Sequence, residues 1–366
     1  SMSRPPSSPR RYLPALAICL VVVAAGIGFV LLYRPPPPAS EPPPASEPPQ
    51  LIQQALATYP AAMARVGIEG NVTLAFSVDL QGKPTQPRVV SYSNPGFVHA
   101  ALQALESCTF TPGTKNGQPV AAGSELDFSF EVAHDGAENA AGLWSVKPPA
   151  TWDPSVAENF RFDIPPRLLG TAFAVYPRAQ LSAGQRARVD MGLVIDPTGK
   201  IVRMTVLNAE APDWAVLAAR AMYGSWKVDP ATRGGKACFA GVRTTVEFLP
   251  DGSGAVPVGP GVVALFRELT KAQPAVVQLA DLDAPPHAYV QDRPAPDWVP
   301  ADKAHGRVVI DYFIDPEGDV LIPSVVSPPN PELGAFAAQL VQGWVFAPPQ
   351  KGGKPITAHA TVSLDF

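Results

Sequence analysis

In three stretches of the chain, apolar residues alternate with residues of a second, more polar set. The apolar residues are spaced two apart; they are Val72, Leu74, Phe76 and Val78, then Val189, Met191, Leu193 and Ile195, and finally Val308, Ile310, Tyr312 and Ile314. A period of two with one apolar face indicates a half-buried strand of an antiparallel sheet. The chain is therefore predicted to contain this strand three times.

The same four-residue turn follows each of these strands, at Asp79–Gly82, Asp196–Gly199 and Asp315–Gly318. Aspartate accepts main-chain N–H bonds at the first position of a turn, and glycine takes a positive φ at the last. The acidic residues could also be taken for metal ligands, but a turn motif repeated at the same place three times favours a hairpin. We predict a second strand after each turn.

A short amphipathic helix is predicted after each hairpin. The apolar residues follow a helical spacing in Leu333, Phe336, Ala337, Leu340 and Val341, in Trp214, Leu217, Ala218 and Ala221, and more loosely in Phe97, Ala101 and Leu105. Such a stripe is suited to cover one face of a sheet. A loop and a further alternating strand follow each helix, so the repeated unit is αββαβ. We predict an α+β fold of three such repeats in tandem, 51–133, 160–249 and 280–366, each a three-stranded antiparallel sheet with helices packed on one face.

The N-terminal part of the chain has a different character. Residues 13–33 are uncharged and apolar, and this length suffices for one transmembrane helix. Arginines cluster in residues 1–12, so the positive-inside rule places this stretch in the cytoplasm. A cleaved signal peptide is the alternative. Residues 34–50 form a proline-rich spacer, in which Pro35–Pro49 is predicted to extend over about 45 Å, at about 3.1 Å per residue.

Composition restricts the function. The 366 residues carry a net charge of -4, which does not favour nucleic-acid binding. The five histidines and three cysteines show no spacing typical of a metal site, no nucleophile–base pair is apparent, and no cofactor-binding motif occurs. We therefore expect no enzymatic activity, no cofactor, no metal and no disulfide.

The ordered set of motifs resembles the C-terminal domain of the TonB family. The third repeat carries Gly306 and Val308 at its first strand, the Asp315–Gly318 turn, and the W-x-F-x-P motif at 344–348. The first carries Tyr59 and Pro60, then Gly70 and Val72, the Asp79–Gly82 turn, and Phe110 with Pro112, followed by a G-x-P loop as in the third.

The resemblance implies a function. Domains of this family capture a short segment of an outer-membrane receptor, the TonB box, by adding it to the sheet as a strand. They transmit energy from the inner-membrane proton-channel proteins ExbB and ExbD. By this resemblance the receptor-binding residues are those of the last strand and of the Y-P segments, namely Thr361, Val362, Ser363, Leu364, Asp365, Phe366, Tyr59, Pro60, Tyr176 and Pro177.

Two hypotheses about the function follow. In the first, the protein is a TonB-like energy transducer, held in the inner membrane by a single pass, with its C-terminal domains in the periplasm of a Gram-negative-type bacterium. In the second, it is a membrane-anchored adaptor that uses the same fold for protein–protein binding without a proton channel. The absence of histidine from 13–33 favours the adaptor, because the family's transmembrane helix usually carries one. An open last strand can also pair with a second copy, so a homodimer is a further expectation.

Overall fold

The structure, a computed structural model, describes residues 47–66, 68–131, 146, 148–170, 172–254, 256 and 258–366. These residues lie within one contact unit, Pro43–Phe366. The predicted segments 1–12 and 13–33, and the spacer up to residue 46, lie outside the described residues. In the part that the structure describes, no helix is both long enough and apolar enough to cross a membrane.

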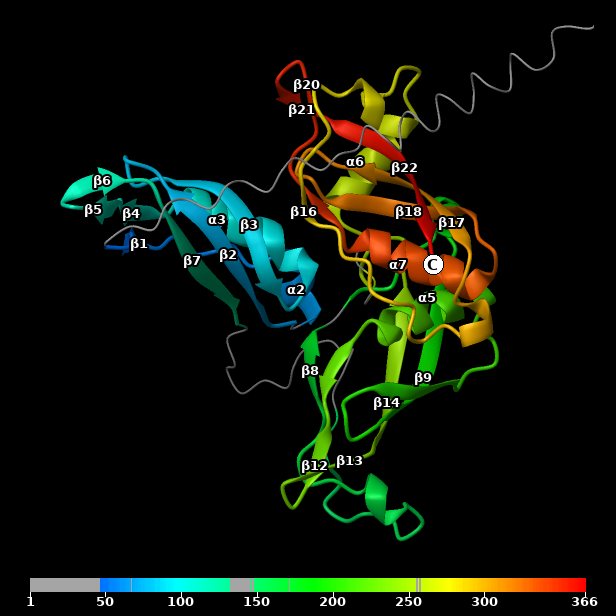
Figure 1. Cartoon of the computed structure of the whole chain (residues 1–366). Coiled ribbons are helices and arrows are strands. Elements are labelled where there is room, and N and C mark those ends of the chain that lie inside the picture. The colour runs from blue at the N-terminus through cyan, green and yellow to red at the C-terminus, as the bar shows by residue number, and fades with distance from the viewer. Residues whose placement is uncertain are drawn as a thin grey trace, which may run out of the picture. The chain divides into compact units, whose positions relative to one another are not determined.

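The first sheet is formed by β2, β3 and β7, with β2 in the centre (Figure 1). Both pairings are antiparallel, and α3 packs against β2 and β3. The elements of this segment are β1 (Gln50–Gln53), α2 (Ala61–Val66), β2 (Gly70–Val78), β3 (Pro84–Tyr92), the 3-10 turn η1 (Pro95–Phe97), α3 (Val98–Glu106), β4 (Thr109–Thr111), β5 (Gly113–Lys115), β6 (Gln118–Val120) and β7 (Ala122–Phe130). Val72 and Leu74 are fully buried, which confirms the predicted apolar face.

The second sheet repeats this order, with β9 between β10 and β14 and with α5 packed on β9 and β10. Its elements are η2 (Glu158–Phe160), β8 (Arg167–Gly170), α4 (Arg178–Ser182), β9 (Ala187–Ile195), β10 (Ile201–Val206), α5 (Asp213–Gly224), β11 (Lys227–Asp229), β12 (Ala231–Arg233), β13 (Lys236–Cys238) and β14 (Ala240–Phe248). All four predicted core residues of β9 are buried.

The third sheet has the same three strands and one more. β17 lies between β18 and β22, and α7 packs on β17 and β18 and against α5 (Figure 1). The elements are α6 (Pro260–Leu269), β15 (Val276–Gln278), η3 (Leu279–Asp281), β16 (Ala288–Val290), η4 (Ala301–Lys303), β17 (Arg307–Ile314), β18 (Val320–Ser327), α7 (Pro331–Gln342), β19 (Val345–Phe346), β20 (Gln350–Lys351), β21 (Lys354–Pro355) and β22 (Thr357–Asp365). The prediction of three antiparallel strands is incomplete here, because β15 joins β22 as a fourth strand and runs parallel to it.

A second, smaller pairing recurs that the sequence did not predict. In each segment, a short strand that precedes the long central strand of the main sheet pairs with the strand that follows the main helix: β1 with β4, β8 with β11, and β16 with β19. Glu47, which the sequence placed in the spacer, pairs with Thr114 through main-chain bonds of 3.0 and 3.1 Å. Glu47 and Gln50 therefore pair with β5 and β4, the short strands that follow α3, rather than extending the spacer.

The predicted aspartate–glycine turns are confirmed. The Asp79 Oδ1 atom accepts the amides of Gln81 and Lys83 at 2.9 and 2.8 Å, and Gly82 has a φ of 77°. A Cβ at Gly82 would lie 2.0 Å from the carbonyl oxygen of Phe110. Glycine is required here for two reasons: the positive φ, and the close approach of the chain that follows the helix.

Candidate functional site

The last strands of the first and second sheets present regular outer edges. β7 pairs with β2 along its whole length, from Ala122 opposite Val78 to Phe130 opposite Gly70, without a register shift. β14 pairs with β9 in the same continuous way. Both strands lie at the edge of their sheets. An edge strand of this kind offers a straight row of main-chain donors and acceptors to an added strand.

The opposite edges are irregular. The pairings of β3, β10 and β18 with their central strands all contain register shifts. β3 contains Pro84 and Pro87, and β18 contains Pro323. Gln86 and Ile322 take positive φ angles of 52° and 41°. Bulges and prolines hinder the pairing of a further strand, so β7 and β14 are the better docking edges.

The outer edge of the third sheet is partly covered. β15 pairs with β22 at Thr357, Ala358 and His359, and the Gln278 Nε2 atom lies 3.1 Å from His359 Nδ1. The predicted receptor-binding residues 361–366 lie beyond this register. Within them, Thr361, Ser363 and Asp365 are exposed, whereas Leu364 is buried and Val362 lies on the core side with it. Only the three exposed side chains can contact an added strand on the open face.

The end of β22 is held by its own sheet. Phe366 exchanges two main-chain bonds with Gly306, of 3.1 and 3.2 Å, and its ring packs edge-on against Phe336. The predicted role of Phe366 in partner binding is not tested by these contacts, but they show that its ring belongs to the core of the third sheet.

The two predicted tyrosines have a structural role. The Tyr59 hydroxyl donates to the carbonyl of Ile68, and its ring lies edge-on to Phe97 and Phe130. The Tyr176 hydroxyl donates to Gln185, nine residues on as in the first segment, and its ring packs on Trp214 and Phe248.

These rings occupy equivalent places in the two sheets. Burial raises the pKa of both hydroxyls. Tyr176 is 5% exposed and offers a partner little surface. Pro60 and Pro177 lie directly before α2 and α4, where their carbonyls accept the first helical amides. Binding by these four residues stays a prediction.

Charged side chains on the open faces form local networks. In the second sheet Asp190 accepts from Thr245 at 2.6 Å and from Arg188 at 3.1 Å, and these bonds, the one from Thr245 first, lower the pKa of its carboxyl. In the third sheet the Arg307 guanidinium binds Asp365 at 2.7 Å and lowers the pKa of that carboxyl. In each case a side chain of the central strand is bonded to a side chain of the last strand of the same sheet.

An arginine from the second segment covers part of the third open face. The Arg178 Nη1 atom lies 2.7 Å from Asp311 Oδ2, and its Nη2 donates to the Ile322 carbonyl at 3.0 Å. The guanidinium also lies 4.9 Å from the centre of the Phe313 ring. Both charged partners are mostly buried, and His359 Nε2 contacts Oδ1, the other carboxylate oxygen of Asp311. This face is therefore less accessible than that of the first sheet.

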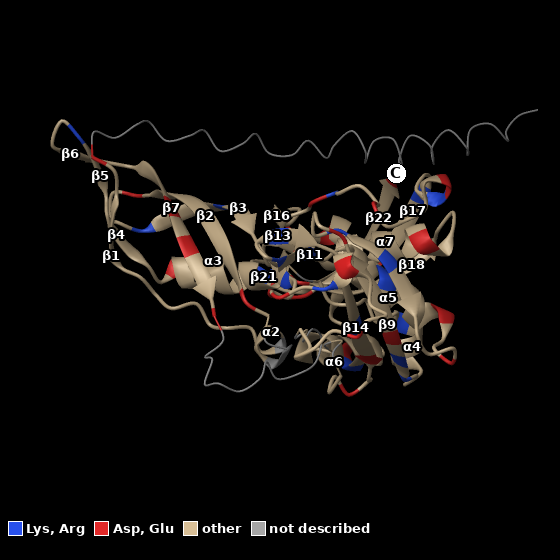
Figure 2. Ribbon diagram, turned by 90° about the horizontal axis from the view of Figure 1, so that it is seen from below, with Lys and Arg blue, Asp and Glu red and all other residues tan. Residues whose placement is uncertain are grey.

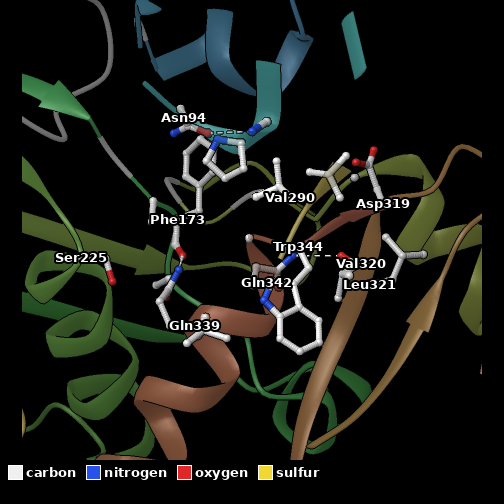
Figure 3. A pocket seen from close by; sticks show the side chains of 18 of the residues that line it. Asn94, Phe173, Ser225, Val290, Asp319, Val320, Leu321, Gln339, Gln342 and Trp344 are labelled. Atoms are coloured by element: carbon white, nitrogen blue, oxygen red, sulfur yellow. Dashed lines mark hydrogen bonds between the residues drawn. The ribbon is translucent and has the colours of Figure 1, made fainter. Parts of the chain in front are cut away.

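A cavity of about 1800 Å³ is lined by residues from all three segments (Figure 3). Two of its polar side chains bind the main chain: Gln339 Nε2 donates to Phe173 at 2.7 Å and Trp344 Nε1 to Asp292 at 3.2 Å. The first bond joins the third segment to the second at the cavity wall, and the second bond lies within the third segment. We therefore regard the cavity as a junction between segments, and the outer edges as the candidate binding site.

The structure adds little chemistry to these edges. Cys108 and Cys238 are both free thiols. Among the residues that the structure describes, no group of three or more histidine, cysteine, aspartate or glutamate side chains could hold a metal ion. What the edges offer a partner is hydrogen bonding along the strand and side-chain contact on the open face.

Residues 55–132 and 297–366 match the family model described as the Gram-negative bacterial TonB protein C-terminal. No curated protein matches the chain. Among solved structures, it is similar to the solution structure of the TonB C-terminal domain of Pseudomonas aeruginosa, with 23% identity over 23% of this chain and 87% of that one, and a TM-score of 0.21. The predicted second repeat, 160–249, lies outside both matched segments. The predicted resemblance is thus confirmed: two segments of this chain resemble the C-terminal domain of the TonB family.

Proposed function

We propose that this protein is a TonB-like energy transducer that captures receptor segments by adding them to an outer sheet edge. The observation that carries the proposal is the contrast between the two edges of each sheet. β7 and β14 pair without interruption, whereas β3, β10 and β18 are interrupted by register shifts. Main-chain bonds along a regular edge supply affinity for an extended segment. The family match of 55–132 and 297–366 supports the same conclusion.

The proposal includes the arrangement expected from the sequence. Three tandem TonB-C-like domains would follow a single transmembrane segment at 13–33 and a spacer, and would lie in the periplasm of a Gram-negative-type bacterium. The partners would be an outer-membrane receptor and inner-membrane channel proteins like ExbB and ExbD. The recurrence of one strand order in all three sheets supports the tandem arrangement. No enzymatic step is part of this proposal.

A second candidate function rests on one sequence feature. Residues 13–33 contain no histidine, so a membrane-anchored adaptor that binds partners without proton-channel coupling is the alternative. Both functions use the same edges. They differ in whether the full chain associates with channel proteins in the membrane.

The test of strand capture uses extended peptides and the full chain. Amide hydrogen exchange is measured with and without a receptor-box peptide of about eight residues, matched by a peptide of the same sequence with alternate amides N-methylated. Protection of β7, β14 or β22 by the first peptide alone is the expected result. If no outer strand gains protection at millimolar peptide, strand capture is excluded. Crosslinking in membranes, scored for channel proteins, then separates the transducer from the adaptor.

A further inference from the structure

The last strands of the three sheets, β7, β14 and β22, differ in charge at one equivalent position. Ala122, Ala240 and Ala358 lie opposite the residue that precedes each aspartate turn, so they mark the same register. Three residues further along each strand are Glu125, Arg243 and Thr361. One edge is therefore acidic, one basic and one neutral at the same place. Figure 2 shows acidic residues in red and basic residues in blue on the strands.

The acidic edge belongs to the first sheet. Glu125 and Asp127 are both exposed and lie two apart on the open face of β7. Their cross-strand neighbours are Ala75 and Thr73, of which Thr73 donates to Asp127 at 2.7 Å. In the described part of the chain neither carboxylate forms an ion pair with lysine or arginine. Both charges are thus available to a strand added along β7.

The basic edge belongs to the second sheet. Arg243 is exposed and lies opposite Gly192, which has no side chain to share the open face with it. The next position along β14 is Thr245, which donates to Asp190 at 2.6 Å and is held in the sheet. Arg243 is therefore the charged side chain that faces an added strand at this register.

The third edge is neutral at this register. Thr361 lies opposite Asp311, and its hydroxyl is 3.4 Å from that carboxylate. Asp311 is already bound by Arg178 and His359. This position offers an added strand a hydroxyl group rather than a free charge.

We propose that the outer edges select partner segments by charge: β7 takes an extended segment with lysine or arginine opposite Glu125 and Asp127, and β14 takes one with aspartate or glutamate opposite Arg243. The inference rests on the proposed strand capture. An added strand places its residue directly opposite the edge residue, with Cβ atoms about 5 Å apart, and like charges there are destabilising. Since Glu125 and Asp127 lie two apart, the basic residues of the segment must also lie two apart.

Three labelled peptides test the proposal. They share an alternating apolar core and differ only at two open-face positions, which are both lysine, both glutamate or both serine. Binding to the full chain is measured by fluorescence anisotropy, and the occupied strand is located by hydrogen exchange. We expect the lysine peptide to protect β7 and the glutamate peptide to protect β14. Each should bind about tenfold more tightly than the other at its own edge, and the preference should weaken as salt is added.

Charge-reversed variants provide the decisive comparison. E125K/D127K should weaken the binding of the lysine peptide to β7 about tenfold and leave the binding of the glutamate peptide to β14 unchanged. R243E should weaken the binding of the glutamate peptide to β14 about tenfold and leave the binding of the lysine peptide to β7 unchanged. The matched control is E106K/E210K, because both glutamates are exposed, lie outside the outer strands, and give the same change in net charge. E125Q/D127N removes the charges without reversing them and should abolish the preference.

The two failures are distinguishable. If all three peptides bind with equal affinity, or if E125K/D127K behaves as the control does, charge selection is wrong while strand capture stands. If no peptide protects any outer strand, strand capture fails, and the selection proposed for it fails with it.

Discussion

The amide of Phe346 donates a hydrogen bond of 2.9 Å to the carbonyl of Gly318, at the hairpin turn of the third sheet. The equivalent bond joins Phe110 to Gly82 at 3.0 Å. Each bond fastens the segment that follows the main helix to the turn between the first two strands. The pairing brings the turn so close to this segment that a side chain cannot fit there.

Replacement of Gly318 should therefore be severe. G318A adds a Cβ that would lie 1.9 Å from the Phe346 carbonyl oxygen, at a φ of 100°. A non-glycine residue at such a φ costs about 1–3 kcal/mol, and the contact adds to this cost. The control is G353A, which has a φ of 71° but open space around it. Urea denaturation should give a larger loss of unfolding free energy for G318A; equal losses would mean that the close approach contributes nothing.

The Asp315 carboxyl should make stability depend on pH in the unusual direction. Its burial, and then the nearby Asp319 carboxylate, raise its pKa to about 7. The folded state thus binds a proton that the unfolded state has lost between about pH 4 and 7, so stability falls as pH rises through this window. The lost stability is on the order of 4 kcal/mol, since each pKa unit corresponds to about 1.4 kcal/mol. D315N retains an acceptor for the turn and should flatten this part of the profile, measured as Tm against pH.

Asp196 supplies the matched control for that experiment. It occupies the same turn in the second sheet, but hydrogen bonds, that from the Thr198 hydroxyl first, lower the pKa of its carboxyl. Its contribution is present at neutral pH and is lost as pH falls below the ordinary aspartate range. D196N should therefore change the acid end of the profile and leave the window from pH 4 to 7 as it is in the parent. The same flattening in both variants would contradict the assignment to Asp315.

Arg178 should stabilise the contact between the second segment and the third sheet. Its side chain is 23% exposed and that of Asp311 is 17% exposed, so R178A leaves a mostly buried carboxylate short of its partner. Loss of one partner from such a pair costs about 3 kcal/mol or more. R167A is the control, because the Arg167–Asp229 pair is largely exposed and contributes about 0–1 kcal/mol. We expect the amides of β17 and β18 to exchange faster in R178A but not in R167A. An equal increase in both variants would refute the role of Arg178.

The apolar alternation and the turn motifs predicted the sheets well, because each depends on the conformation and burial of residues that are close together in the sequence. The alternation in β2, β9 and β17 specifies which face is buried, and the aspartate–glycine turns specify the hairpins. The structural role of the two tyrosines was harder to predict. The sequence showed that Tyr59 and Tyr176 occupy equivalent places, but not that their hydroxyls bind carbonyls within their own segments.

Pairings over long separations were not predictable from such patterns. β15 has three residues and no clear periodicity, and its partner is 81 residues away at Val276–Thr357. The pairing of Glu47 with Thr114 was missed because proline-rich sequence around it indicated a spacer. The residue types at Glu125, Arg243 and Thr361 were visible in the sequence, but the equivalence of these positions could be seen only from the register of each sheet.

The short strand β15 should control access to the third outer edge. V277P removes the Val277 amide, which is a potential donor in the parallel pairing with β22, and proline is tolerated poorly within a ladder. The amides of Thr357, Ala358 and His359 should then exchange faster, and an extended peptide should gain a site along the whole of β22. V277A is the control, because it keeps the amide while shortening the side chain. Peptide binding at β22 that is the same in V277P, V277A and the parent would show that β15 does not limit this edge.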